Sequence, residues 1–286
     1  METDQHFKRR LRDRPRVRSG LSIVPSLFTI GNMFCGYYSI LSTLRGNYDT
    51  AAIAIGLGLL LDLLDGRIAR LTNTESDFGI ELDSLADLLT FGIAPAVMAL
   101  NWGVNSLSGI SPQSAQDLYK FGSLSTFAFL VCGTLRLARF NVQARKSANE
   151  LAGGRDFVGL PIPAAAAVIA AIVHFDKAPI SEPGHAFLLY FLVSLLAFLM
   201  ISRVRYPSFK KLDLKKPRPR TTILGTAMLI GLVVFFSENV LIALAIAYLC
   251  SGPVARISQA IRHFILASRL KQGHRPKRIK RQEDLP

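Results

Sequence analysis

The sequence predicts an all-α, polytopic membrane protein, and three observations carry this prediction. Half of the 286 residues are hydrophobic, and they gather in runs long enough to cross a bilayer as helices. The net charge is +14, and the basic residues lie between these runs. A nucleic-acid-binding protein would instead collect its basic residues on one folded face. We therefore expect anionic membrane lipids, and no nucleic acid, as partners of the basic segments.

The apolar runs divide the chain into about eight transmembrane helices. Six of them form a catalytic core over residues 21–202, and two additional helices occupy residues 221–265. Basic segments precede, separate and follow these parts: an arm at 1–20, a loop at 203–220 and a tail at 266–286. The expected spans are 22–44, 51–71, 79–101, 119–141, 160–176, 185–202, 221–237 and 239–261.

The distribution of positive charge predicts the orientation of these spans. If the N-terminus is cytosolic and the spans alternate, 31 of the 34 Lys and Arg fall on the cytosolic side. The exceptions are Arg45, Lys120 and Lys177. Both termini are therefore expected in the cytosol, in a multi-pass protein of the plasma (inner) membrane.

Four aspartates mark the second and third spans, within LDLLDGRIARLTNTESDFGIELDSLADLL. A carboxylate at the centre of a membrane helix costs about 2.5–3.5 kcal/mol, so four of them are expected to face a wet cavity, a cation, or both. Asp62 and Asp65 are three residues apart and Asp83 and Asp87 are four apart, so each pair shares a helix face.

If the two helices run antiparallel after their short turn, residues at equal distances from the turn lie at the same depth in the membrane. This arrangement pairs the four aspartates at two levels, called rungs here. Asp62 lies level with Asp87, and Asp65 lies level with Asp83. Small residues, Ala69 and Gly79, meet nearer the cytosolic mouth, where they would let a phosphate chain approach the backbone. The crowded negative charge and the oxygen-only ligands favour Mg²⁺ or Mn²⁺, and two ions would clamp a diphosphate. The alternative is an ion or solute transporter that relays ions through the same acids.

The spacing of this segment resembles the signature of the CDP-alcohol phosphotransferase family. The pattern D-x2-D-G-x2-A-R-x8-G-x3-D-x3-D is matched at every fixed position. The resemblance implies that an alcohol attacks the lipid-linked phosphorus of a CDP-activated lipid and that CMP leaves. It implies metal binding by all four aspartates, with Asp87 also taking the proton of the attacking hydroxyl, and it implies a homodimer. The positions that would hold the CDP moiety are Gly66, Ala69, Arg70 and Gly79.

Two polar residues of the first span extend this interpretation. Thr29 and Asn32 lie within one turn of an otherwise apolar helix, and the family's first span helps line the nucleotide pocket. Asn32 could alternatively make a hydrogen bond between packed helices, and Thr29 could bond its own helix backbone. Arg70 could alternatively anchor a helix end by its positive charge.

A second segment bears on the acceptor alcohol. The runs RLARFN and FVGLPIPAAA, within residues 133–166, are similar to the integral-membrane phosphatidylserine synthases of bacteria and archaea. This resemblance implies CDP-diacylglycerol and L-serine as substrates, with Arg136, Arg139 and Asn141 as candidate serine contacts. The arginines could instead anchor the helix end or bind a lipid phosphate. Arginines also suit the phosphate of glycerol 3-phosphate, so this acceptor or an inositol-type alcohol stays open. The GLPIP residues could form a rigid loop over the site or simply start a helix.

Overall fold

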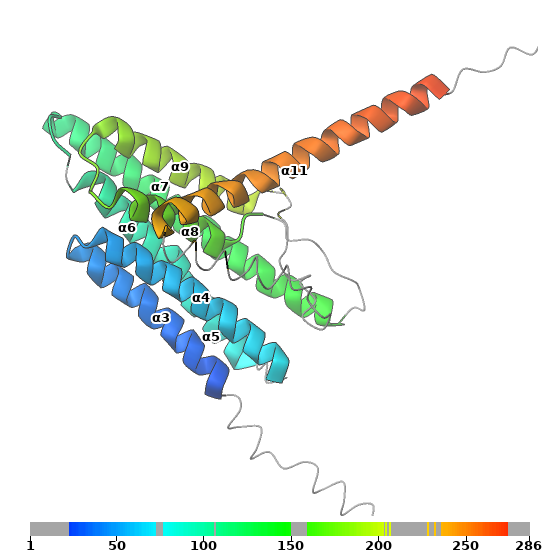
Figure 1. The fold of residues 1–286 in the computed structure, drawn as a ribbon, viewed down its shortest axis with the longest axis horizontal. Helices are drawn as coiled ribbons and strands as arrows, with labels where there is room; N and C mark the ends of the chain where they lie inside the picture. The colour runs from blue at the N-terminus through cyan, green and yellow to red at the C-terminus, as the bar shows by residue number, and fades with distance from the viewer. Residues whose placement is uncertain are drawn as a thin grey trace, which may run out of the picture.

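The computed structural model describes residues 23–72, 77–105, 107–149, 159–202, 204, 206, 228, 232 and 236–273, and all regular structure within them is helical. Figure 1 shows the helices packed as a bundle from which the last one projects. The helices are α3 (Ile23–Leu44), α4 (Tyr48–Thr72), α5 (Asp77–Asp87), the π-helical η1 (Leu88–Ile93), α6 (Ala94–Val104), α7 (Pro112–Asn149), α8 (Ile162–Asp176), α9 (Pro183–Ile201) and α11 (Ser237–Gly273).

The helices coincide with seven of the expected spans, and the expected all-α class is confirmed for the described residues. The third span is not a uniform α-helix, because η1 separates α5 from α6. The α7 and α11 helices are longer than expected, and α11 continues into the predicted tail at 266–286. The basic arm at 1–20, the loop at 207–220 and nearly all of the span at 221–237 lie outside the described residues.

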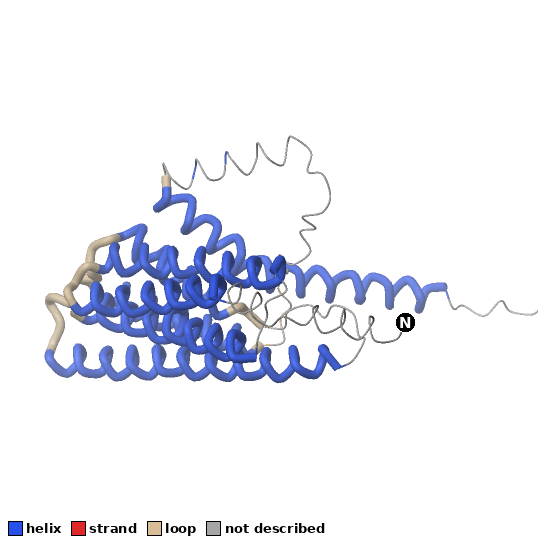
Figure 2. Tube along the Cα trace, turned by 90° about the horizontal axis from the view of Figure 1, so that it is seen from below, coloured by secondary structure: helices blue, strands red, loops and turns tan. Residues whose placement is uncertain are grey.

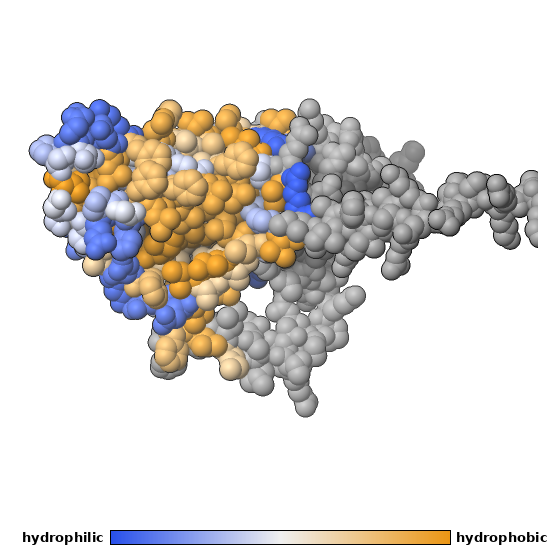
Figure 3. All heavy atoms as spheres, turned by 90° about the horizontal axis from the view of Figure 1, so that it is seen from above, coloured by the Kyte–Doolittle hydropathy of each residue, from blue (hydrophilic) through white to orange (hydrophobic). Residues whose placement is uncertain are grey.

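Within the described residues, four helical stretches are long and apolar enough to cross a membrane: Phe78–Val104, Pro112–Gln143, Pro183–Ile201 and Ser237–Val254. The α8 helix is apolar but shorter. The α3 and α4 helices, which carry some of the polar side chains of the candidate site, are not among the four, whereas Asp83 and Asp87 lie within Phe78–Val104. Figure 3 shows a wide hydrophobic area on the face in view, bounded at one end by hydrophilic residues. This pattern is typical of a helical membrane protein.

The core is built around α8, whose alanine-rich sequence lets its neighbours pack closely. It contacts α4, α11 and η1, while α3 lies along α4 and α7 lies along α9. Figures 1 and 2 show α3, α4, α7 and α9 running roughly side by side, with turns gathered at one end, and Figure 1 shows α11 crossing the bundle. The fully buried α8 side chains include Ile162, Ala165, Ala166, Ile169 and Val173.

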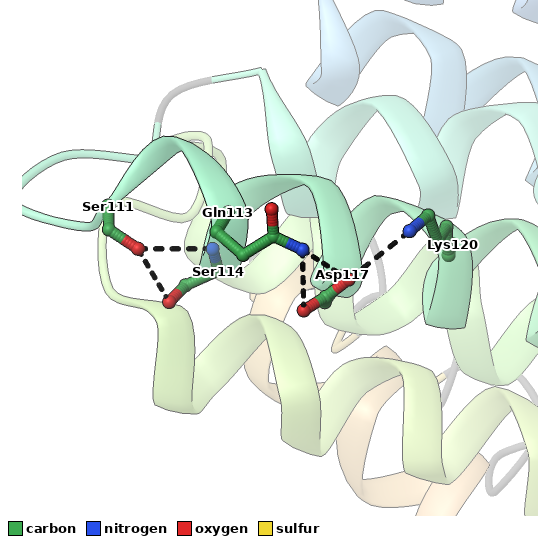
Figure 4. A network of polar contacts seen from close by, with 5 residues as sticks. All are labelled: Ser111, Gln113, Ser114, Asp117 and Lys120. Atoms are coloured by element: carbon green, nitrogen blue, oxygen red, sulfur yellow. Dashed lines mark hydrogen bonds and ion pairs between the residues drawn. The ribbon is translucent and has the colours of Figure 1, made fainter.

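The residues just before and at the start of α7 explain why this helix begins where it does. Ser111 accepts a hydrogen bond of 3.2 Å from the Ser114 backbone N–H, and Pro112 is the first residue of α7. Figure 4 shows the contacts that follow along this first part of α7, where Asp117 accepts from Gln113 and pairs with Lys120 at 3.3 Å. Lys120, one of the three outlying basic residues, therefore has an acidic partner on its own helix.

The GLPIP segment leads into α8, and its backbone is hydrogen-bonded to residues at and just after the end of α9. Pro163 lies in the first turn of α8, so the expected helix start is confirmed. Gly159 has a φ of +89°, and its N–H donates to the Val204 carbonyl at 2.8 Å, while Leu160 N–H donates to Leu199 at 3.1 Å. The left-handed backbone at Gly159 suits glycine, because other residues rarely adopt it.

Candidate active site

Three carboxylates converge where α4 and α5 both pack against α3. Asp62 comes from α4, Asp83 and Asp87 come from α5, and one oxygen of each lies within 4.8 Å of the others. One Asp83 oxygen is buried and has no hydrogen-bond partner among the described residues. Hard divalent cations such as Mg²⁺ and Mn²⁺ prefer carboxylate oxygens, and a cation would offset the mutual repulsion of these groups. The donor set therefore fits a divalent metal ion.

Asp65 is held beside this group by α3. Its side chain is buried, at 4% exposure, and accepts a 3.0 Å hydrogen bond from the Thr29 hydroxyl. Its charge lies near enough to Asp62 and Asp83 to act on both. One oxygen of Asp62 lies within 4.8 Å of one of Asp87, as expected for that rung. Asp83 belongs to the same group, and the charge of Asp65 acts on Asp83, so the four carboxylates form one cluster rather than two isolated rungs.

Asn32 of α3 reaches the other side of the cluster. Its Nδ2 donates to the Asp87 carboxylate at 3.5 Å, while its Oδ1 is buried without a partner among the described residues. The Asn32 carbonyl accepts a 2.8 Å hydrogen bond from Thr90, the third residue of η1. The first span thus contacts the aspartates directly through Asn32 and Thr29.

The π-helical turn after Asp87 is packed tightly by two glycines. A Cβ placed on Gly36 would come within 2.6 Å of the Thr90 side chain, and one on Gly58 within 2.7 Å. Real side chains do not tolerate such contacts, so α3 and α4 need glycine at these positions to approach η1. Single π turns inside helices often occur at functional sites, and this one re-aims the helix just beyond Asp87.

The positions expected to hold the CDP moiety are described in part. A Cβ on Gly66 would meet nothing within 4 Å, so the backbone there borders open space. Gly79 is half-buried near the start of α5. The side chains of Ala69 and Arg70 lie outside the described part of α4. The open backbone at Gly66 is suited to close approach by a phosphate chain.

The three candidate serine contacts occupy different surroundings in the second half of α7. Arg136 is half-buried, its Nε has no hydrogen-bond partner among the described residues, and its charge interacts with Asp87. Asn141 donates a 2.8 Å hydrogen bond to the Ser84 hydroxyl, in the turn of α5 that carries Asp83 and Asp87. Arg139 is exposed. The structure brings Arg136 and Asn141 to the aspartate cluster, and leaves Arg139 at the surface.

Two residues beside the site were missed by the sequence interpretation. Ser84 holds Asn141, and Thr90 fixes η1 to the carbonyl of Asn32. Ser84 stands next to Asp83 in the sequence, so its position in the motif could have indicated it. Thr90 lies in an apolar run, and nothing in the sequence indicates that the helix changes its winding there.

Comparisons with known proteins place the chain in a family. Residues 22–182 match the family model described as CDP-alcohol phosphatidyltransferase. A CDP-diacylglycerol–serine O-phosphatidyltransferase of Helicobacter pylori is 38% identical over 192 residues, which are 67% of this chain and 74% of the relative. A protein of the same name from Bacillus subtilis is 36% identical over 67% of this chain and 93% of its own length.

An archaeal relative and a solved structure extend the comparison. The archaetidylserine synthase of Methanothermobacter thermautotrophicus is 34% identical over 64% of this chain and 69% of its own length. The phosphatidylinositol phosphate synthase of Mycobacterium tuberculosis, solved with CDP-DAG bound, is 22% identical with a TM-score of 0.43, over 66% of this chain and 88% of that one. This last likeness is too weak to carry an argument. The family model and the sequence relatives agree: the chain belongs to the CDP-alcohol phosphatidyltransferase family.

Proposed function

We propose that this protein transfers the phosphatidyl group of CDP-diacylglycerol to the hydroxyl of L-serine, giving phosphatidylserine and CMP. The observation that carries the proposal is the convergence of Asp62, Asp83 and Asp87 within 4.8 Å, beside Arg136, in a chain of this family. The names of the bacterial relatives support serine as the acceptor, and that of the archaeal relative supports a serine-containing product.

The aspartates would hold two divalent ions, Mg²⁺ or Mn²⁺, with Asp65 completing the ligand set. When bound, such ions neutralise charge on the diphosphate and on the leaving CMP. Gly66, Ala69, Arg70 and Gly79 would hold the CDP moiety, with Thr29 and Asn32 beside them. The open backbone at Gly66 supports this assignment. Thr29 and Asn32 would act through the carboxylates that they contact, Asp65 and Asp87.

Asp87 would accept the proton of the serine hydroxyl as its oxygen attacks the lipid-linked phosphorus. The Asn32 amide holds the Asp87 carboxylate from α3, which would keep it directed at the hydroxyl. The serine carboxylate would pair with Arg136, whose Nε has no protein partner among the described residues. Asn141, fixed by Ser84, supplies a neutral acceptor for the serine ammonium.

The membrane arrangement is part of the same proposal. Eight spans, cytosolic termini and a cytosol-facing site would place the aspartates on the side where serine and CMP are dissolved. The charge asymmetry of the sequence supports this orientation. A homodimer in the plasma membrane, with anionic lipids around its basic segments, completes the proposal.

The experiment is CMP release by the purified full-length protein with CDP-diacylglycerol and Mg²⁺ or Mn²⁺. Serine, glycerol 3-phosphate and an inositol phosphate are supplied separately, and Asp87→Asn is the matched inactive control. We expect release with serine alone in the wild type, and none with Asp87→Asn despite retained CDP-lipid binding. Release only with another alcohol would overturn serine as acceptor, and full turnover by Asp87→Asn would remove Asp87 as the base.

A further inference from the structure

Thr90, the third residue of η1, links the helix that carries Asp87 to α3. Its side chain is fully buried, and its hydroxyl donates to the Asn32 carbonyl at 2.8 Å. Helical threonines commonly bond a carbonyl of their own helix. Among the described residues, three threonines bond the carbonyl four residues earlier: Thr43, Thr126 and Thr134. Thr90 instead bonds a different helix, so the position of η1 is connected to that of α3.

A glycine on α3 makes this contact possible. The carbonyl of a residue in an α-helix points toward the residue four positions later, so the Asn32 carbonyl points toward Gly36. A Cβ on Gly36 would come within 2.6 Å of the Thr90 hydroxyl oxygen and 2.8 Å of the Thr90 Cα. A carbonyl oxygen has two lone pairs, so it can accept from Thr90 as well as from its own helix. Gly36 therefore leaves the Asn32 carbonyl accessible to a donor from η1.

A glycine on α4 packs against the same two residues. A Cβ on Gly58 would come within 2.7 Å of Thr90 Cγ2 and 2.9 Å of Asn32 Oδ1. Asn32 is fully buried, and its Oδ1 has no hydrogen-bond partner within the described part of the chain. An ionised carboxylate only accepts hydrogen bonds, so the Asn32 amide presents its Nδ2 to Asp87 and leaves its Oδ1 beside Gly58. Residues of α3, α4 and η1 thus meet around the Asn32 side chain.

Both partners of the Thr90–Asn32 hydrogen bond are also connected to Asp87. Asn32 Nδ2 donates to the Asp87 carboxylate at 3.5 Å, and η1 begins at the residue after Asp87. A shift of η1 against α3 would therefore change the distance between the amide and the carboxylate. This hydrogen bond is already longer than the usual 2.7–3.2 Å, so a small shift would remove it. The Thr90 hydroxyl is the contact that opposes such a shift.

We propose that Thr90 is a positioning residue, which keeps the Asn32 amide and the Asp87 carboxylate in register so that Asp87 can accept the proton of the acceptor hydroxyl. This inference rests on the proposed function, because it takes Asp87 as the base. A base has to lie within hydrogen-bond reach of the proton that it accepts, so its orientation affects the rate directly. Thr90 does not touch the reacting atoms; it acts through Asn32, and Gly36 and Gly58 provide the space for its contacts.

The test compares Thr90→Val, Thr90→Ser and Thr126→Val in the full-length protein. Valine keeps the shape of threonine and removes the hydroxyl, while serine keeps the hydroxyl. Thr126 is the matched control, because it is 5% exposed and its hydroxyl bonds only its own helix. We expect a roughly tenfold lower kcat for CMP release in Thr90→Val, since misplaced catalytic groups lose rate, and a KM within about twofold for both substrates. Thr90→Ser should recover most of the kcat, and Thr126→Val should match wild type.

A double-mutant cycle with Asn32→Ala then separates positioning from a purely structural role. If Thr90 acts through Asn32, adding Thr90→Val to Asn32→Ala lowers kcat by less than about twofold. Both valine variants lose one buried hydroxyl, so a loss of stability alone would affect them alike. A wild-type kcat in Thr90→Val, the same loss in Thr126→Val, or multiplicative effects in the double variant would each overturn the inference.

Failure of the proposed function would be visible separately. If the wild-type protein releases CMP only with another alcohol, the serine assignment fails, and the same kcat comparison with that alcohol decides the role of Thr90. Mn²⁺ binding without substrate, followed by electron paramagnetic resonance, gives a comparison without turnover. Because Asp87 belongs to the carboxylate group that fits a metal ion, Thr90→Val should bind Mn²⁺ roughly tenfold more weakly than Thr126→Val. Equal Mn²⁺ affinities would show that Thr90 does not position Asp87.

Discussion

Thr29 donates a 3.0 Å hydrogen bond to Asp65, so a hydroxyl from the first helix of the core orients a carboxylate on the second. Both side chains are buried, at 5% and 4% exposure, which makes this contact costly to lose. It holds Asp65 beside the three carboxylates that lie within 4.8 Å of one another. Thr29 therefore has a role in arranging the acidic cluster as well as any contact with the nucleotide.

The first prediction concerns this hydrogen bond. Thr29→Val keeps the shape of the side chain and removes its donor, so Asp65 is no longer oriented. Groups that orient metal ligands typically contribute tenfold or more to metal affinity, and we expect a roughly tenfold higher Mn²⁺ concentration at half-maximal CMP release. Thr29→Ser keeps the hydroxyl and should restore the wild-type value. Equal metal dependence in Thr29→Val would show that Asp65 needs no orientation from α3.

The second prediction separates the two arginines in the second half of α7. The Arg136 side chain is half-buried and its charge interacts with Asp87, whereas Arg139 is exposed. Each substitution by Gln removes one charge from the same turn of the helix, so the two variants are matched. We expect Arg136→Gln to raise the serine KM by roughly tenfold or more, because a charge-assisted hydrogen bond is lost. Arg139→Gln should stay within about twofold of wild type. A larger rise in the serine KM for Arg139→Gln than for Arg136→Gln would instead place the acceptor site at the surface of α7.

The sequence predicted the helices and the acidic pairs well, for physical reasons. Membrane helices are long apolar runs, and helical periodicity places Asp83 and Asp87, four residues apart, on one face of α5, where both join the carboxylate group. What it could not predict depends on contacts between distant segments. Thr29 reaches Asp65 across 36 positions, and Asn141 reaches Ser84 across 57. Pairing residues by their distance from the turn considers α4 and α5 as an isolated pair of helices. It therefore cannot include the hydrogen bond that α3 makes to Asp65 through Thr29.

The winding change at η1 has the same kind of cause. Thr90 bonds the carbonyl of Asn32 and packs against Gly36 and Gly58, which come from two other helices. A π turn interrupts the regular hydrogen bonding of an α-helix. Here it occurs where η1 packs against two other helices, and the local sequence does not encode that packing. The exposure of Arg139 likewise follows from how α7 is rotated against its neighbours, which sequence spacing does not fix.

The third prediction concerns the attachment of α11. His174 lies between Asp49 and Ser237, and it is 8% exposed. His174→Ala leaves both partners without their hydrogen bond, which should cost about 1–3 kcal/mol. Lys177→Met removes only the neighbouring exposed ion pair with Glu238 and should cost less. Thermal unfolding in detergent measures both, and equal losses would mean that burial of His174 adds nothing to the attachment.

The last prediction contrasts two glycines that should fail in different ways. Gly159 has a φ of +89°, and a Cβ there would come within 2.3 Å of the Met200 carbonyl oxygen. Gly159→Ala should therefore lower the stability by more than about 1 kcal/mol, measured by thermal unfolding. Gly66 has open space in the direction of its missing Cβ, so Gly66→Ala should leave the thermal midpoint unchanged. If the backbone at Gly66 borders the CDP diphosphate, the added methyl group should instead raise the KM for CDP-diacylglycerol. An unchanged KM together with an unchanged midpoint would exclude Gly66 from the nucleotide site, since neither folding nor binding would then depend on it.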